Sequence, residues 1–342
     1  MLRHYLLAAL LWCTCVYADA QEQKVVNIQL DARGSYKREY VDGHAVNQNS
    51  GFKGDLIDVV INGNLSSRFG YMYRQRLNGI NKDRTFFEAT DFLYLRYQAT
   101  RHMAILGGKW ALMLGGWEFD AKPIDVFQLN EYAYHIPCYE WGVNMILNTD
   151  NGKDQWVAQV CESPFRKIYE DAKGQSADMY AYNLIWYGHH GRLHTIWSTN
   201  LIEYAPGHYS HFISLGNKVN IADKVDCYVD IQNRASTGQR FLLSDCSIYG
   251  KVMYRPTEKL DVYARVGYDV NQSGTDKDQT LSDGTEITTV GGGVNYYPLK
   301  DKTLRFHATY NYSFGKNTTP EAFLQNKQSL IDVGMSWAMK VL

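Results

Sequence analysis

Four arginines on two neighbouring stretches of the chain are the residues best suited to chemistry. Arg68, Arg74 and Arg76 occupy polar positions of one alternating segment, and Arg96 occupies a polar position of the next. A guanidinium keeps its charge and bonds a carboxylate or a phosphate at two points. If these side chains line one wall of a water-filled passage, that wall attracts small anions. The alternative is that they pair with aspartate and glutamate and only fill a wide, wet interior.

Histidine, serine and asparagine form the other set that could do chemistry. His189, His190 and His194 precede Ser198 and Asn200, and a serine hydrolase needs a serine, a histidine and a polar third residue side by side. The G-x-S-x-G turn that exposes such a serine does not accompany them. We therefore expect no enzyme, keeping a hydrolase as the alternative, and we expect no cofactor and no metal.

The segments that carry these residues alternate apolar and polar side chains from about residue 24 to the last residue. In one of them, Leu260, Val262 and Ala264 alternate with Asp261 and Arg265. A period of two places the two sets on opposite faces of a β-strand. Its repetition, with aromatic residues near the ends of the apolar rows, predicts an all-β, transmembrane antiparallel barrel with an apolar outside and a polar lumen.

The alternation divides into sixteen segments, an even number that suits a closed antiparallel barrel. They form a single barrel domain over 21–342, without a linker. The expected strands are 24–37, 54–64, 66–78, 88–99, 102–111, 138–148, 155–163, 178–188, 191–202, 207–217, 223–234, 244–256, 258–270, 286–297, 302–314 and 329–341.

The alternation, which separates odd-numbered from even-numbered positions of a strand, also assigns which side chains face the lumen. Phe69, Tyr71 and Tyr73 form the apolar row of the third strand, so its arginines point inward. Turning them outward would expose each guanidinium to lipid, at about 2–4 kcal/mol near the bilayer midplane.

The longest break in the pattern runs over 112–137. It contains Gly115, Gly116 and Pro123 and is neither strand-like nor low in complexity. A long ordered loop in a compact barrel usually has a function. We expect it to fold into the lumen and constrict the passage, with an ordinary external loop as the alternative.

The N-terminus and the composition indicate the compartment. Arg3 and His4 precede an apolar run, and Ala18-Asp-Ala20 ends it, which predicts a signal peptide over 1–20 cleaved before Gln21. The formal net charge is −1, which argues against nucleic acid as a partner. No apolar segment of helix-spanning length follows the leader. We expect a barrel in the outer membrane of a bacterium, in contact with its lipid.

Residues 91–118 carry a resemblance to a known family. Asp91-Phe-Leu-Tyr-Leu-Arg-Tyr97, then Gly107-Gly-Lys109, then Gly115-Gly-Trp-Glu118 resemble a strand, a second strand and a turn into the constriction loop of the phosphate-selective porins O and P. The final strand, with Asp332-Val-Gly-Met-Ser-Trp337, is also similar to that family.

The resemblance implies a sixteen-stranded porin, a homotrimer, that passes small solutes by passive diffusion and favours anions such as phosphate. On the matching positions, Arg74, Arg76, Arg96 and Lys109 would form the anion path, together with Arg68 by parity. A general or sugar-conducting porin is the alternative solute class. A closed structural barrel is a third possibility, but about eight strands already fill their interior with side chains, whereas sixteen leave a channel.

Overall fold

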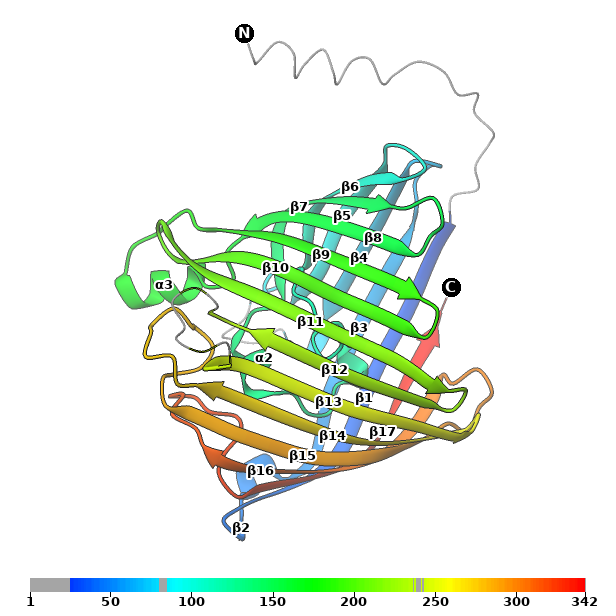
Figure 1. Cartoon of the computed structure of the whole chain (residues 1–342). Helices are drawn as coiled ribbons and strands as arrows, with labels where there is room; N and C mark the ends of the chain where they lie inside the picture. The colour runs from blue at the N-terminus through cyan, green and yellow to red at the C-terminus, as the bar shows by residue number, and fades with distance from the viewer. Residues whose placement is uncertain (1–24, 80–84, 236, 238–240, 242, 342) are drawn as a thin grey trace.

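An antiparallel sheet that closes on itself forms the body of the protein (Figure 1). The computed structural model describes residues 25–79, 85–235, 237, 241 and 243–341. Each long strand pairs with the next in sequence, and β1 (Val25–Val41) closes the ring by pairing with β17 (Gln328–Lys340). The expected leader over 1–20 lies outside the described residues, so its cleavage stays a prediction.

Sixteen long strands make the wall, which confirms the expected number and fold class. The remaining long strands are β3 (Gly51–Asn64), β4 (Phe69–Arg76), β5 (Thr90–Gln98), β6 (Met103–Ala111), β7 (Tyr139–Asn148), β8 (Asp154–Glu162), β9 (Tyr180–His190), β10 (Leu193–Ala205), β11 (His208–Ala222), β12 (Val225–Asn233), β13 (Asp245–Thr257), β14 (Leu260–Asn271), β15 (Thr285–Tyr296) and β16 (Leu304–Lys316). The shorter elements are β2 (His44–Ala45), η1 (Asn47–Asn49), η2 (Leu77–Gly79), η3 (Pro123–Asp125), α2 (Glu131–His135) and α3 (Arg166–Lys173).

Each expected segment overlaps one long strand, and the differences lie at the ends. β11 continues to Ala222, where the pattern predicted an end at 217. β4 begins at Phe69, so Arg68 lies in the preceding turn and not on the strand, which corrects the expected placement of that arginine. Strand ends are the least certain part of a pattern-based assignment because the alternation fades where the chain leaves the sheet.

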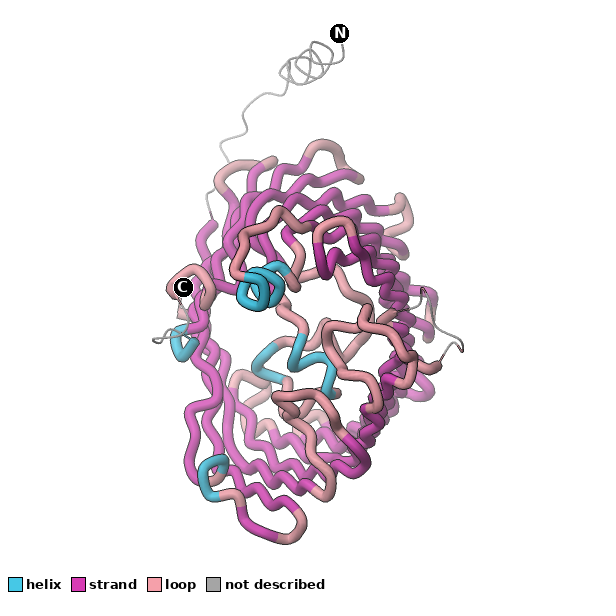
Figure 2. The backbone as a smooth tube through the Cα atoms, turned by 90° about the vertical axis from the view of Figure 1, so that its left-hand side faces the viewer, coloured by secondary structure: helices cyan, strands magenta, loops and turns pink. Residues whose placement is uncertain are grey.

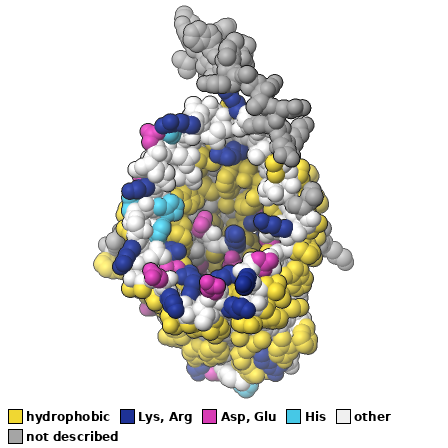
Figure 3. All heavy atoms as spheres, turned by 90° about the vertical axis from the view of Figure 1, so that its right-hand side faces the viewer, with side chains coloured by type: hydrophobic (Ala, Val, Ile, Leu, Met, Phe, Trp, Pro, Cys, Tyr) yellow, Lys and Arg dark blue, Asp and Glu magenta, His cyan; other side chains and the backbone are white. Residues whose placement is uncertain are grey.

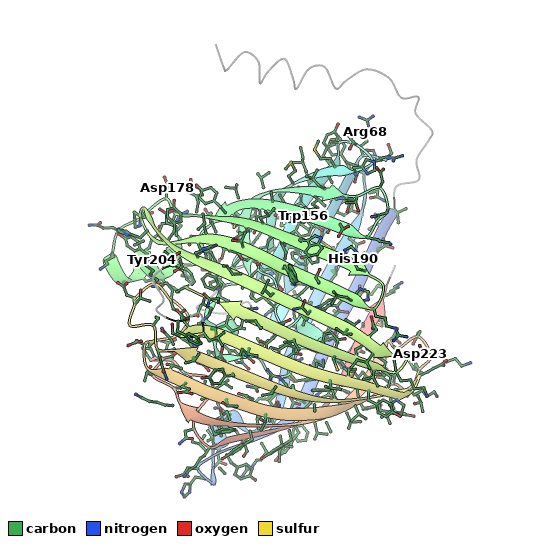
Figure 4. All side chains as sticks on the ribbon, viewed as in Figure 1. Arg68, Trp156, Asp178, His190, Tyr204 and Asp223 are labelled. Atoms are coloured by element: carbon green, nitrogen blue, oxygen red, sulfur yellow. The ribbon has the colours of Figure 1, made fainter. Side chains whose placement is uncertain are left out.

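The two ends of the barrel differ in the length of their connections. Two residues join β9 to β10, β11 to β12 and β13 to β14, at the end where β1 starts and β17 stops. We call this the turn end; Figure 4 labels Arg68, His190 and Asp223 there. The opposite, loop end holds the longer connections, with Asp178 and Tyr204 labelled.

The outer face of the wall is apolar. Leu95 and Val143 expose 55% and 56% of their surface on it. Near the turn end, Trp156, Trp186 and Trp197 are direct partners across β8, β9 and β10. Their ring centroids lie 5.8 and 5.2 Å apart, and indole rings favour the membrane–water boundary. This face is therefore suited to lipid.

No helix among the described residues is long and apolar enough to cross a membrane.

The connection from β6 to β7, residues 112–138, folds inside the ring of strands; we call it the infolded loop. Figure 2 shows short helical and loop segments inside the ring of strands. Leu112, Leu114 and Tyr132 of this loop are buried against inward-facing Ile202 and Phe212 of the wall. The lumen is thus narrowed by a packed loop, as the break in the pattern predicted.

Candidate functional site

Buried polar contacts attach the middle of the infolded loop to β14. Arg265 donates through Nη2 to Oε1 of Glu118 at 2.8 Å, and both side chains are about 5% exposed or less. The same oxygen of Glu118 accepts the backbone N–H of Asn130 at 2.9 Å. Farther along, the N–H of Glu131 donates to Asp269 at 2.7 Å. Arg265 Nη2 also donates to Asn130 Oδ1 at 3.1 Å, and these shared buried contacts hold the loop against the strand.

Two further arginines hold the tip of the loop. Arg33 of β1 donates to the carbonyl oxygens of Pro123, Ile124 and Val126. Arg305 of β16 donates to Asp125 at 2.5 Å and to the Ile124 carbonyl at 2.6 Å.

A phenylalanine lies between these two arginines. The Phe127 ring centroid is 5.2 Å from the Arg33 guanidinium carbon and 5.1 Å from that of Arg305, within range of a cation–π contact. The loop tip is therefore fastened by charge as well as by packing.

The start of the loop follows the wall closely. Gly115 N–H donates to Ser198 Oγ at 2.8 Å, and Gly116 N–H donates to the Ile196 carbonyl at 3.2 Å. At Gly116, φ is +110°, and a Cβ there would lie 2.7 Å from Gln232 Nε2. Only glycine fits this left-handed, crowded position.

These contacts also bear on the hydrolase alternative. Ser198 is buried, accepts from Gly115 and donates to Asn200 at 2.7 Å. His194 pairs instead with His189, ring nitrogen to ring nitrogen at 2.9 Å. Since His194 lies four residues from Ser198 on one strand, about 13 Å at 3.3 Å per residue, no histidine–serine dyad forms at these positions.

Loop 272–284, between β14 and β15, also folds against the loop end. Arg234 is fully buried and donates to Asp278 at 2.9 Å, to Asp245 at 3.0 Å and to the Val270 carbonyl at 2.7 Å. Leu281 of the same loop joins the apolar cluster of the infolded loop. The infolded loop and loop 272–284 therefore both narrow the lumen at the loop end.

The inward arginines of β4 lie where parity predicted, but each has an acidic partner. Arg74 contacts Asp91 at 3.1 Å, and Arg76 contacts the same carboxylate at 2.9 Å. Asp58 lies 3.9 Å from Arg76. The positive charge of this wall is therefore largely offset, because two carboxylates lie among two guanidiniums.

Aromatic side chains complete the β4–β5 wall. The Arg74 guanidinium lies 4.1 Å from the Phe92 ring centroid and donates to the Tyr139 hydroxyl at 2.5 Å. Next to them, Tyr94 and Trp110 stack with ring centroids 4.6 Å apart. These rings fix the arginine in place and present an amphipathic surface to the lumen.

The other three sequence candidates do not join that pair. Arg96 is exposed nearer the turn end and bonds Gln98 at 2.6 Å. Arg68 lies in the turn before β4. The register sets Lys109 opposite Leu93 and Trp141, whose exposed side chains lie on the outer face. Lys109 Nζ donates to the Phe87 carbonyl at 2.9 Å.

Burial changes the acidity of the infolded loop. It raises the pKa of Glu118 to about 8, although the Arg265 guanidinium lowers it. Burial also raises the pKa of Asp120 to about 6. At neutral pH the loop therefore carries less negative charge than its sequence suggests.

The turn end opens into a hollow. Figure 3 looks into it and shows hydrophobic side chains on its upper wall and Lys, Arg, Asp and Glu side chains around its lower rim. Among the residues described, no group of three or more His, Cys, Asp or Glu is placed to hold a metal ion.

One important residue was missed by the sequence reasoning. Arg33 fastens the loop tip, yet the anion path expected from the sequence contains only Arg68, Arg74, Arg76, Arg96 and Lys109. Arg33 shares its parity with Lys37 in β1, and Lys37 bonds Asp55 at 2.5 Å. The alternation therefore indicates that Arg33 faces inward, but it does not show that Arg33 bonds the backbone of the loop tip.

No family model and no curated protein sequence matches this chain, so the resemblance to phosphate-selective porins stays a prediction. Solved structures do match. An anion-selective porin from Comamonas acidovorans superimposes with TM-score 0.65 at 8% identity, covering 93% of this chain and 100% of that one. In-vitro folded OmpT, an outer membrane protein of Vibrio cholerae in trimer form, superimposes with TM-score 0.56 at 13% identity, covering 93% of this chain and 100% of that one. A mutant of Rh. blastica porin superimposes with TM-score 0.58 at 11% identity, covering 91% of this chain and 100% of that one. The fold is therefore that of outer-membrane porins.

Proposed function

We propose that this protein is a porin of a bacterial outer membrane that passes small hydrophilic solutes by passive diffusion. The observation that carries the proposal is the infolded loop, which is fastened inside a sixteen-stranded barrel by Arg33, Arg265 and Arg305. A barrel of this size has room for a channel, and a fastened loop sets its width. A lumen built only for stability would need no such loop.

The proposed preference is for anions, phosphate among them, and it is mild. Arg96 is exposed near the turn end, and Glu118 is largely neutral at pH 7 because burial raises its pKa to about 8. Both features favour anions near the turn end and the loop. Arg74 and Arg76 contribute less than their number suggests, since Asp58 and Asp91 offset them.

That offset also supports a second candidate, a general or sugar-conducting porin. The wall beside the paired arginines carries the stacked Tyr94 and Trp110 rings. Aromatic rings with polar edges suit a sugar as well as a wall. The two candidates differ in whether charge or stacking selects the solute.

A homotrimer is part of the proposal. It is supported by the fold shared with an outer membrane protein that occurs in trimer form. The mass of the native detergent-solubilised protein tests it: three chains per particle are expected, and a monomer would contradict it.

The deciding experiment is the reversal potential of the purified protein in a planar bilayer under a KCl gradient. We expect conductance with a mild anion preference. In the double variant R74A/R76A, Asp58 and Asp91 lose their partners, so the preference should move toward cations. R101A is the matched control, because Arg101 and its partner Asp150 are about three-quarters exposed and should change little.

Each outcome has a distinct meaning. Conductance without charge preference would keep the porin and transfer the proposal to the general or sugar-conducting class. A folded barrel that inserts but never conducts would overturn the porin.

A further inference from the structure

Two cavities lie one after the other between the infolded loop and the wall of β13–β17. The first, of about 300 Å³, is near the loop end and is lined by Gln128, Tyr134, Asn311, Phe323 and Gln328. The second, of about 240 Å³, is lined by Gln128, Lys251, Tyr263, Asn295 and Arg305. Gln128 lines both cavities, so this one side chain lies at the boundary between them.

The first cavity is polar and contains one carboxylate, Glu39, which accepts a hydrogen bond from Gln328 Nε2 at 3.0 Å. Besides Gln128, its amides come from Asn49, Asn311, Gln325 and Gln328. The Tyr134 and Phe323 rings stack at its edge with centroids 4.4 Å apart. Amides next to aromatic rings bond hydroxyl groups.

The second cavity contains a cation with no acidic partner of its own. Its acids each lie beside an arginine and not beside Lys251: Glu118 is 2.8 Å from Arg265, Asp125 is 2.5 Å from Arg305 and Asp261 is 4.0 Å from Arg255. Lys251 has no ion pair and no hydrogen bond to any residue that the structure describes. Its ammonium instead lies 4.8 Å from the Tyr263 ring centroid.

The register increases the effect of this cation. Lys251 stands directly opposite Arg265 in the β13–β14 pair, and like charges directly opposite each other are destabilising. An anion bound in the cavity beside Lys251 would reduce that repulsion.

A polar group that accepts hydrogen bonds faces the same cavity. Asn295 is 5% exposed, and its Oδ1 has no hydrogen-bond partner among the described residues. A buried acceptor without a donor costs free energy until a donor arrives. The hydroxyls of Tyr263 and Tyr297 lie in the same lining. The site therefore suits a solute that carries both a negative group and a hydroxyl donor.

From these observations we infer that the second cavity is a binding subsite for small hydroxylated anions, carboxylates or phosphates that also carry hydroxyl groups. Such a solute is held through its negative group by Lys251 and through a hydroxyl by Asn295. Solutes from the loop end pass through the first cavity and past Gln128 to reach it. This inference rests on the proposed porin function and names its solute class.

The test is the interruption of single-channel current by gluconate, with glucose as the neutral probe of the same size. In the wild type, gluconate should cause brief interruptions and glucose far fewer. K251M keeps the length of the side chain and removes the charge, and gluconate binding should weaken about tenfold, equivalent to about 1.4 kcal/mol. K251R keeps the charge and should remain within a few-fold of the wild type.

A second variant locates the route. Q128W places a bulky side chain at the boundary of the two cavities. Gluconate added at the loop end should then cause few interruptions, whereas gluconate added at the turn end should still bind. R101M, which removes one member of an exposed pair, is the control and should leave the interruptions unchanged.

Several results would overturn the inference while leaving the porin in place. They are a conducting wild type that gluconate does not interrupt, equal interruption of K251M and wild type, and equal interruption by glucose. If K251M fails to insert, K251Q replaces it under the same criteria. Absence of any wild-type conductance would instead overturn the proposed function.

Discussion

Removal of the buried guanidinium that fastens the infolded loop gives a sharp test of how the lumen is built. In R265M, the loop loses the bond from Arg265 Nη2 to Glu118 at 2.8 Å and the bond from the same atom to Asn130 Oδ1 at 3.1 Å. The methionine fills part of the volume without a polar group. The attachments of the loop tip to Arg33 and Arg305 remain.

The magnitude follows from the two lost bonds. Breaking a buried pair from one side typically costs about 3–5 kcal/mol because it leaves an uncompensated charge. Here Glu118 can avoid that charge, since its pKa is already about 8 and rises further without Arg265. The cost is then set by two hydrogen bonds to a charged group, at about 1.5–3 kcal/mol each. The lower end of the sum, about 3 kcal/mol, applies because the variant also removes Arg265 Nε and Nη1, which are buried without a partner among the described residues. That loss raises the detached population of the loop roughly a hundredfold.

The assay compares single-channel current noise and protease cleavage within 118–130 in R265M and wild type. We expect more noise and faster cleavage in the variant, with the heat stability of the barrel nearly unchanged, because the strand pairing is untouched. E118Q should show a smaller effect, since its amide oxygen can still accept from Asn130 and Arg265. R101M, which removes an exposed pair, should behave as wild type.

The reasoning would be refuted if R265M matched the wild type in both noise and cleavage. It would also be refuted if R101M and R265M loosened the loop equally, because the effect would then not depend on burial.

Two further predictions concern the pH response and the N-terminus. The Glu118 carboxyl is neutral below its pKa of about 8 and gains a negative charge as the pH rises through that value. The anion preference should therefore fall between pH 7 and pH 9. In E118Q the reversal potential should change less over this range, and parallel curves for both proteins would contradict the assignment. The mass of the protein purified from the outer membrane should correspond to a chain that begins at Gln21, and a mass that includes Met1 would contradict the expected cleavage.

The sequence by itself determined the wall of the barrel. Alternation is a local property of each strand, since successive side chains point to opposite faces. It placed Arg74 and Arg76 on the inner face and Leu93 and Leu95 on the outer face without knowledge of any partner strand. It also identified residues 112–137 as the longest interruption of the alternating pattern, and the structure places this segment inside the lumen.

Tertiary structure decided what the inner side chains contact. Parity places Arg76 in the lumen but cannot show that Asp91, from the next strand, lies 2.9 Å away. The left-handed glycine at 108, with φ of +134°, lies where the alternation of β6 is weak, and only the register shows that Lys109 belongs with Leu93 and Trp141.

The path of the infolded loop depended on the three-dimensional fold in the same way. Arg33, Arg265 and Arg305 are far from 118–126 in sequence, and closing the barrel brings them around the loop. Strand formation follows from short-range periodicity, whereas the pairing of charges across the lumen depends on which walls face each other. For that reason the barrel could be predicted from the sequence, and the cation left unmatched at Lys251 could not.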